Sequence, residues 1–154
     1  MSILSNIHTS FGWSALLWIP GMTIYGLVAG GPVMKARKEF NVDYPNLYAT
    51  PGHHDKADQF NAVQRGHQNF FEGSSATQAM ALFGSIYSSN AAWANCVGAL
   101  LFYIGSHLYA TGYAKYWNVK AGRYKAGGAL KWVGFLIALI TSVMTSLQVV
   151  GIIA

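Results

Sequence analysis

The chain has 154 residues, of which 53% are hydrophobic and only 10% are Asp, Glu, Lys or Arg. Soluble domains carry about 25% charged residues, so this composition excludes a surface that faces water throughout and indicates a membrane protein of one domain. The formal net charge is +5. The single cysteine, Cys96, excludes an intrachain disulfide and a structural zinc site built on several thiolates.

The first predicted membrane span covers residues 11–34, which contain no Asp, Glu, Lys or Arg. A helix of this length crosses the roughly 30 Å hydrocarbon core of a bilayer. We expect the segment to be retained, because its apolar run is too long for the core of a signal peptide. Pro20 predicts a kink near one of its ends.

Three further spans are expected, at residues 58–88, 91–116 and 131–153. The last two rest on charge-free runs at 91–114 and 132–154. The segment 58–88 is apolar only in its second half, so hydropathy alone is a weak argument for it. A short turn at Ser88–Asn90 separates it from the next span.

The positions of the basic residues argue that 58–88 also crosses. Four basic residues lie at 35–56, before this segment, and five lie at 115–131, between the last two spans. Only four crossings place both groups on one side, which the positive-inside rule makes cytoplasmic, with both termini on the other side. A surface-lying helix at 58–88 would split the two groups across the membrane. Topology therefore explains the positive charge, and no nucleic-acid partner is expected. The predicted fold is an all-α, integral membrane four-helix bundle, a single domain over 1–154.

The second span carries three polar residues on one helical face. Arg65, Asn69 and Glu72 stand at i, i+4 and i+7, within about 20 degrees of one another, and climb about 10 Å along the helix. A charge near the bilayer centre costs roughly 2.5 to 3.5 kcal/mol, so these residues should face a protein or water-filled interior. We expect Arg65 and Glu72 to be too far apart for close direct contact.

Two interpretations of this face remain open. A zwitterionic ligand fits it, with Arg65 on a carboxylate, Glu72 on an ammonium group and Asn69 on an amide, and glutathione carries all of these groups. Alternatively, the charges bind partners on other helices and hold the bundle together. Tyr109 and Tyr113 stand at i and i+4 in the third span, and this pattern alone favours an aromatic belt at the membrane interface over a ligand site. No His or carboxylate stands at ligand spacing from His67 or His107 within its helix, so no metal site is expected.

Three segments of the sequence resemble one protein family: KARKEFNVDYPNLYAT, FNAVQRGHQNFFE and YATGY, in this order. They are similar to the MAPEG family, the membrane-associated proteins of eicosanoid and glutathione metabolism, and most of all to its type-three microsomal glutathione S-transferase branch. The resemblance runs from about residue 35 to 130, and FNxxQRxHQNxxE is its most specific motif. It implies a homotrimer of four-helix subunits that binds glutathione between adjacent subunits, near the cytoplasmic side.

The resemblance also implies roles for individual residues. Two would reach the ligand from the neighbouring subunit, Arg37 and His67, and Lys38 would assist proton transfer. The residues that would contact glutathione within one subunit are Arg65, Asn69, Glu72, Tyr109 and Tyr113. The position after Glu72 is a tyrosine in some members and is Gly73 here.

The family activates the glutathione thiol, whose pKa near 8.5 must fall for the thiolate to form. A guanidinium beside the sulfur lowers that pKa, and in the family this arginine follows the YxxGY pair. Here the corresponding segment, AKYWNVKAGRYKAGG, is about two residues longer. Arg123 is the first candidate for this role and Lys120 the second.

The resemblance thus implies a glutathione transferase or peroxidase. Its other substrate would be a lipophilic electrophile or a lipid hydroperoxide that arrives through membrane lipid, in the endoplasmic reticulum or another organelle membrane. A second hypothesis is a non-catalytic member that serves as a structural or interaction subunit of a larger membrane complex.

Overall fold

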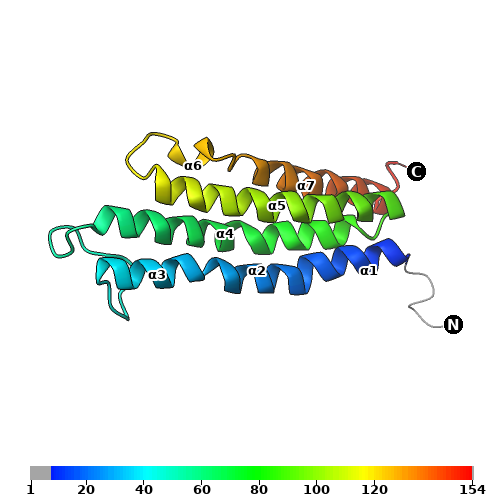
Figure 1. Cartoon of the computed structure of the whole chain (residues 1–154). Coiled ribbons are helices and arrows are strands. Elements are labelled where there is room, and N and C mark those ends of the chain that lie inside the picture. The colour runs from blue at the N-terminus through cyan, green and yellow to red at the C-terminus, as the bar shows by residue number, and fades with distance from the viewer. Residues whose placement is uncertain (1–7, 154) are drawn as a thin grey trace.

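The computed structural model describes residues 8–153, which fold as helices and connections without a strand. The predicted domain 1–154 therefore extends at both ends beyond the described residues. The long helices lie side by side (Figure 1). In chain order the elements are α1 (Thr9–Leu16), η2 (Leu17–Gly21), α2 (Met22–Ala29), α3 (Gly31–Phe40), α4 (Ala57–Gly84), α5 (Ser89–Lys115), α6 (Gly122–Lys125) and α7 (Leu130–Val149).

The elements α1, η2, α2 and α3 follow one another along one side of the molecule (Figure 1). At the position of the predicted kink, η2 is a π-helical turn that contains Pro20. Proline has no N–H group, and wide turns of this kind leave backbone carbonyls without helical partners. The Tyr103 hydroxyl donates to the Leu17 carbonyl at 2.5 Å, and the Gln78 amide donates to the Trp18 carbonyl. Side chains from α5 and α4 therefore satisfy the backbone of the wide turn.

Three stretches of helix are long and apolar enough to cross a membrane: Thr9–Phe40, Ser89–Lys115 and Leu130–Val149. They correspond to the first, third and fourth predicted spans. Helix α4 has 28 residues, but the polar residues of its first half keep it out of this set. It packs against α3, α5 and α7, and its crossing of the membrane stays a prediction.

Two of the helix ends that differ from the predicted boundaries have a clear local cause. Helix α4 ends at Gly84, and the Ser88 hydroxyl accepts a hydrogen bond from the Ala91 N–H as the N-cap of α5. The turn expected at Ser88–Asn90 therefore lies earlier, because a serine cap begins the next helix. Helix α7 ends at Val149 instead of 153, where Gly151 takes a φ of 74° and ends the helix in a left-handed conformation.

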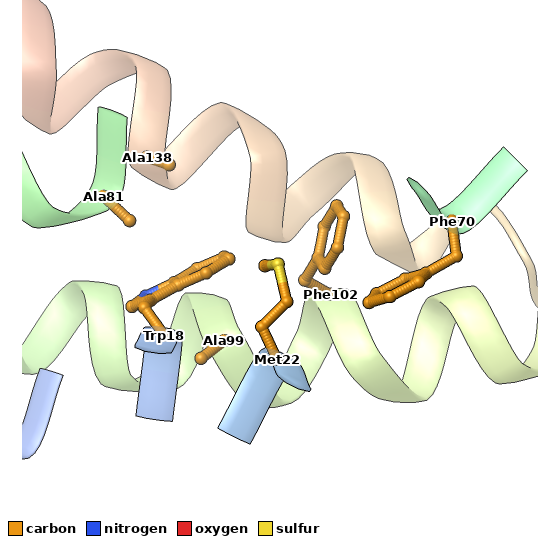
Figure 2. Packing of buried hydrophobic residues seen from close by; sticks show 7 residues of the cluster. All are labelled: Trp18, Met22, Phe70, Ala81, Ala99, Phe102 and Ala138. Atoms are coloured by element: carbon orange, nitrogen blue, oxygen red, sulfur yellow. The ribbon is translucent and has the colours of Figure 1, made fainter. Parts of the chain in front are cut away.

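The core is an aromatic cluster surrounded by small residues. Figure 2 shows its seven buried side chains converging from η2, α2, α4, α5 and α7: Trp18, Met22, Phe70, Ala81, Ala99, Phe102 and Ala138. The Trp18 side chain is completely buried, and its Nε1 donates to the Asn95 carbonyl at 2.8 Å. Outer faces of the same helices carry exposed apolar residues such as Leu27 and Ile140, as expected where lipid is the solvent.

The connection between α3 and α4 is ordered by contacts with both helices. Asn41 ends α3 with a φ of 52°, and Val42 and Ala49 are buried against Phe60. The Asn61 side chain accepts from the Ala49 N–H at 2.8 Å and donates to the Ala49 carbonyl at 3.0 Å. These contacts hold the connection against the start of α4.

Candidate functional site

Arg65 and Glu72 form a direct ion pair on α4. Arg65 Nη1 lies 2.5 Å from Glu72 Oε1, and the two side chains are 44% and 48% exposed. The expectation that these residues are too far apart for close contact is therefore wrong. Both side chains are long, and by leaning toward each other along one helical face they span two turns. The pair lies at the surface of the single chain, so it is accessible to another molecule.

Asn69 connects this ion pair to a buried lysine. Its Nδ2 donates to Glu72 Oε2 at 3.5 Å, and its Oδ1 accepts a hydrogen bond from the ammonium group of Lys131. Lys131 is only 5% exposed, and its Nζ lies 4.1 Å from the centre of the Tyr109 ring. The Asn69 amide accepts a hydrogen bond from a cation and donates one to an anion, so the two opposite charges fix its orientation.

Sequence reasoning missed the role of Lys131, because it counted this residue only among the basic charges between two spans. A lysine that directly opens a long apolar run was the available signal. The burial follows from Gly105 on α5, where an added Cβ would overlap the backbone of Lys131. Without a side chain at Gly105, the start of α7 approaches α5 closely enough to bring Lys131 against Tyr109.

Two tyrosines of α5, Tyr109 and Tyr113, extend this cluster to Arg123. The Tyr109 ring centre lies 5.3 Å from that of Tyr113 and 5.5 Å from that of Tyr124. The Arg123 guanidinium lies 4.9 Å from the Tyr124 ring centre and 6.0 Å from that of Tyr113. Sequence reasoning did not single out Tyr124, which follows Arg123 in the four-residue helix α6.

Gly112, inside the YATGY motif, explains how Arg123 reaches this position. A Cβ at Gly112 would lie 2.7 Å from the Arg123 carbonyl oxygen and 2.9 Å from its Cα. Only glycine leaves room for the backbone of α6 at this point of α5. The same motif therefore provides two aromatic rings and the space that positions the arginine beside them.

The electrostatics of this end of the cluster favour a charged arginine. The hydrogen bond between Arg123 and Tyr124 lowers the pKa of the tyrosine hydroxyl below its ordinary value and raises the pKa of the guanidinium. The cause is the same for both, because this hydrogen bond favours phenolate and guanidinium together. Arg123 thus offers a fixed positive charge at the edge of the cluster.

The remaining predicted site residues lie outside the cluster within this chain. Arg37 donates to the Val42 carbonyl at 3.1 Å, with its guanidinium 4.3 Å from the Tyr44 ring centre. Lys38 is exposed beside Arg37 in a recess of about 160 Å³. Lys120 is exposed in the turn between α5 and α6. Of the two basic candidates for the thiol, Arg123 lies in the cluster and Lys120 does not.

His67 faces a different part of the molecule, an open groove of about 540 Å³ between α2 and α4. Its ring packs edge-on against Phe71, with the ring centres 5.0 Å apart. The groove is mostly apolar, with polar contributions from residues such as Ser74 and Gln78. Gly73, by contrast, faces open space, since an added Cβ would meet nothing within 4 Å. Among residues 8–153, no three His, Cys, Asp or Glu side chains gather as metal ligands.

A comparison with protein-family models matches residues 15–144 to the MAPEG family. The chain belongs to the MAPEG family. The match covers all or most of each of the three helical stretches that could cross a membrane. It also includes the complete cluster from Arg65 to Lys131. Membership identifies a membrane protein related to glutathione and eicosanoid metabolism, in a family that includes glutathione transferases and related enzymes.

Proposed function

We propose that this MAPEG protein is a membrane glutathione-dependent enzyme, a transferase or peroxidase of the type-three microsomal branch, built as a trimer of four-helix subunits. One observation carries the proposal. Three segments distant in the sequence, at Arg65–Glu72, Tyr109–Tyr113 and Arg123, form one connected polar and aromatic cluster, linked through Lys131 and Tyr124.

Binding of glutathione follows from charge complementarity. A glutathione carboxylate replaces Glu72 on the Arg65 guanidinium, and the glutathione ammonium group replaces Arg65 on the Glu72 carboxylate. Both side chains are about half exposed, so the exchange needs no burial of an unpaired charge. Asn69 receives an amide group of the ligand, and the rings of Tyr109 and Tyr113 form the wall beside it.

The chemical step requires the thiolate. Arg123 stabilises the negative sulfur and so lowers the pKa of the thiol, which releases its proton to water or to a base. In the transferase reaction the sulfur lone pair forms the C–S bond, and the electrophile's leaving group departs with the electrons of the broken bond. In the peroxidase reaction the sulfur attacks the hydroperoxide, an S–O bond forms and the O–O bond breaks, and the lipid leaves as an alkoxide that takes up a proton to become the alcohol. A second glutathione then reduces the sulfenic acid to give the disulfide and water.

Assembly as a trimer explains why charged side chains are exposed on a membrane chain. Arg65 and Glu72 facing lipid would be costly, so a second subunit should cover this face. In the proposed trimer, Arg37 and His67 of the neighbouring subunit complete the site, and Lys38 assists proton transfer. The basic connections face the cytoplasm by the positive-inside rule, which places both termini on the other side, in the endoplasmic reticulum or another organelle membrane.

Thermal unfolding of the purified protein in detergent tests the proposal. Glutathione at about 100 times its Kd should stabilise the folded protein by about 2.7 kcal/mol, and Arg65→Ala should remove most of this effect. Lys35→Ala, an exposed basic residue of α3 outside the cluster, is the matched control. A protein without any shift in glutathione, and with unchanged behaviour in Arg65→Ala, would contradict a glutathione site.

The second candidate function is a non-catalytic subunit, and the direct Arg65–Glu72 ion pair is the observation in its favour. In that case the two charges satisfy each other and act only in the packing of helices. Loss of thermal stability in Arg65→Ala, with no response to glutathione in wild type, is the result that this alternative requires.

A further inference from the structure

The net positive charge of the protein lies entirely in residues 115–131, which run from the last residue of α5 through the connection to the start of α7. Among residues 35–58, four basic side chains are matched by four acidic ones, and Arg65 is matched by Glu72. Residues 115–131 contain five basic side chains and no acidic one. The net charge of +5 therefore belongs to this one short stretch of the chain, and residues 35–58 contribute none of it.

Three of these cations are held at the surface of an ordered connection. Lys115, Lys120 and Lys125 are exposed, and the ammonium groups of Lys115 and Lys125 lie 5.5 and 5.7 Å from the centre of the same Tyr116 ring. Backbone hydrogen bonds fold the turn that carries Lys120, from Val119 N–H to the Tyr116 carbonyl at 3.0 Å and from Gly122 N–H to the Val119 carbonyl at 2.9 Å.

These like charges have no carboxylate partner in the part of the chain that the structure describes. The only salt bridge among residues 8–153 is Arg65–Glu72, and neither residue belongs to the connection. Two ammonium groups near one ring repel each other, and an anion bound nearby relieves the repulsion. The arrangement is therefore suited to a polyvalent anion from outside the chain.

The position of the connection indicates where that anion is. Helix α5 ends at Lys115 and α7 begins at Leu130, and both helices are long and apolar enough to cross a membrane. The connection thus lies where two spans leave the hydrocarbon core. Trp117 is 42% exposed and Tyr124 is 37% exposed, and these two residue types favour the depth of lipid headgroups.

We propose that the connection between α5 and α7 binds the phosphate headgroups of anionic phospholipids of the surrounding bilayer, with Lys115, Lys120 and Lys125 as the charged contacts. Trp117 lies among the headgroups beside them. The position of the connection at the membrane surface and its exposed Trp117 and Tyr124 favour a lipid as the anion. An acidic protein segment would not require aromatic residues that favour the headgroup region. This site goes beyond the proposed enzymatic function and does not depend on it, since none of these three lysines takes part in the cluster around Asn69.

Native mass spectrometry of the purified protein in mixed micelles tests the proposal, with phosphatidylserine and phosphatidylcholine compared at equal concentrations. Wild type should bind phosphatidylserine at lower concentration than phosphatidylcholine. The double variant Lys115→Gln/Lys125→Gln should weaken phosphatidylserine binding about 25-fold, from roughly fivefold for each basic residue near an anionic surface. Lys115→Arg/Lys125→Arg should restore the binding.

The matched control is Lys35→Gln/Lys56→Gln, which lowers the net charge by the same two units, at one residue of α3 and one of the connection between α3 and α4. It should leave phosphatidylserine binding within about twofold of wild type. Equal losses in the two double variants, at equal thermal stability, would show that overall charge is responsible and overturn the proposal. Displacement of the lipid by inorganic phosphate at similar concentration, or tighter binding of a polyglutamate peptide, would also overturn it.

Discussion

The ammonium group of Lys131 donates a hydrogen bond to Asn69 Oδ1 and lies 4.1 Å from the centre of the Tyr109 ring. A single side chain at the start of α7 thereby connects the polar face of α4 with the aromatic residues of α5. If the cluster binds glutathione, Lys131 orients the amide that the ligand meets.

We expect Lys131→Met to weaken glutathione binding at least tenfold, because a hydrogen bond to a charged group contributes roughly 1.5 to 3 kcal/mol. The thermal stability should change little or rise, since a buried charge is replaced by an apolar side chain of similar length. Glutathione KM and thermal unfolding measure the two effects. Lys35→Met, exposed on α3, is the control, and an unchanged KM in Lys131→Met would contradict this role.

Exchanging the two charges of α4 separates binding from packing. In Arg65→Glu/Glu72→Arg the ion pair can re-form, so thermal stability should stay within about 1 kcal/mol of wild type, as is usual for exposed pairs. Glutathione binding should be lost, because each charge of the ligand now meets a like charge. Titration calorimetry with glutathione measures this, and full binding by the exchanged variant would show that the pair serves packing alone.

Gly112→Ala, a substitution in α5, should displace Arg123 in the neighbouring helix α6. The added methyl group would meet the Arg123 backbone at 2.7 Å, so α6 must move and the guanidinium moves with it. We expect a loss of thiolate absorbance from bound glutathione and a fall in kcat, with about 1 to 3 kcal/mol lost in stability. Gly73→Ala is the control, since its methyl group enters open space and alanine favours the helix. Equal thiolate absorbance in both variants would exclude a positioning role for Gly112.

Tyr124 should make the stability rise with pH on the alkaline side. The hydrogen bond to Arg123 lowers the pKa of Tyr124 below the ordinary 10.0, so between the two values the unfolded chain binds the extra proton. Stability from this group is therefore fully present above pH 10 and lost as the pH falls through the folded pKa. Ultraviolet titration of phenolate should show an early-ionising tyrosine in wild type that is absent in Tyr124→Phe and shifts upward in Arg123→Gln. An unchanged titration curve in Tyr124→Phe would contradict the assignment.

Trp18→Phe should destabilise the bundle by about 2 to 4 kcal/mol. The substitution leaves a cavity in the cluster of Figure 2 and removes the donor to the Asn95 carbonyl. Thermal unfolding in detergent measures the loss. Trp13→Phe, at a side chain that is 52% exposed, should change the stability by less than 0.5 kcal/mol.

The sequence was sufficient for features that depend on neighbours along one helix. The apolar runs around Trp18, Phe102 and Ala138 predict three of the long helices, and the spacing of Arg65, Asn69 and Glu72 predicts a single face. Features that depend on contacts between helices were missed. Lys131 looks like a loop charge until Gly105 brings α7 against α5.

The ion pair was missed for a different reason. The distance between Arg65 and Glu72 was judged from the rise of the helix backbone, whereas two long, half-exposed side chains can close that distance themselves. Tyr124 belongs to a helix of only four residues, which has too few turns to show a periodic pattern. Both errors concern side-chain reach and short elements, and neither affects the choice of Arg65, Asn69 and Glu72.

The wide turn η2 also determines how far α1 and α3 can slide along their neighbours. The carbonyls of Leu17 and Trp18 are held by Tyr103 of α5 and Gln78 of α4, so a shift by one residue would break two hydrogen bonds to two different helices at once. The helical stretch Thr9–Phe40 is thus held in axial register at a point in its first half. Because α3 continues the same helical stretch, these two hydrogen bonds also fix the axial position of Arg37 and Lys38 near its other end, far from the turn itself.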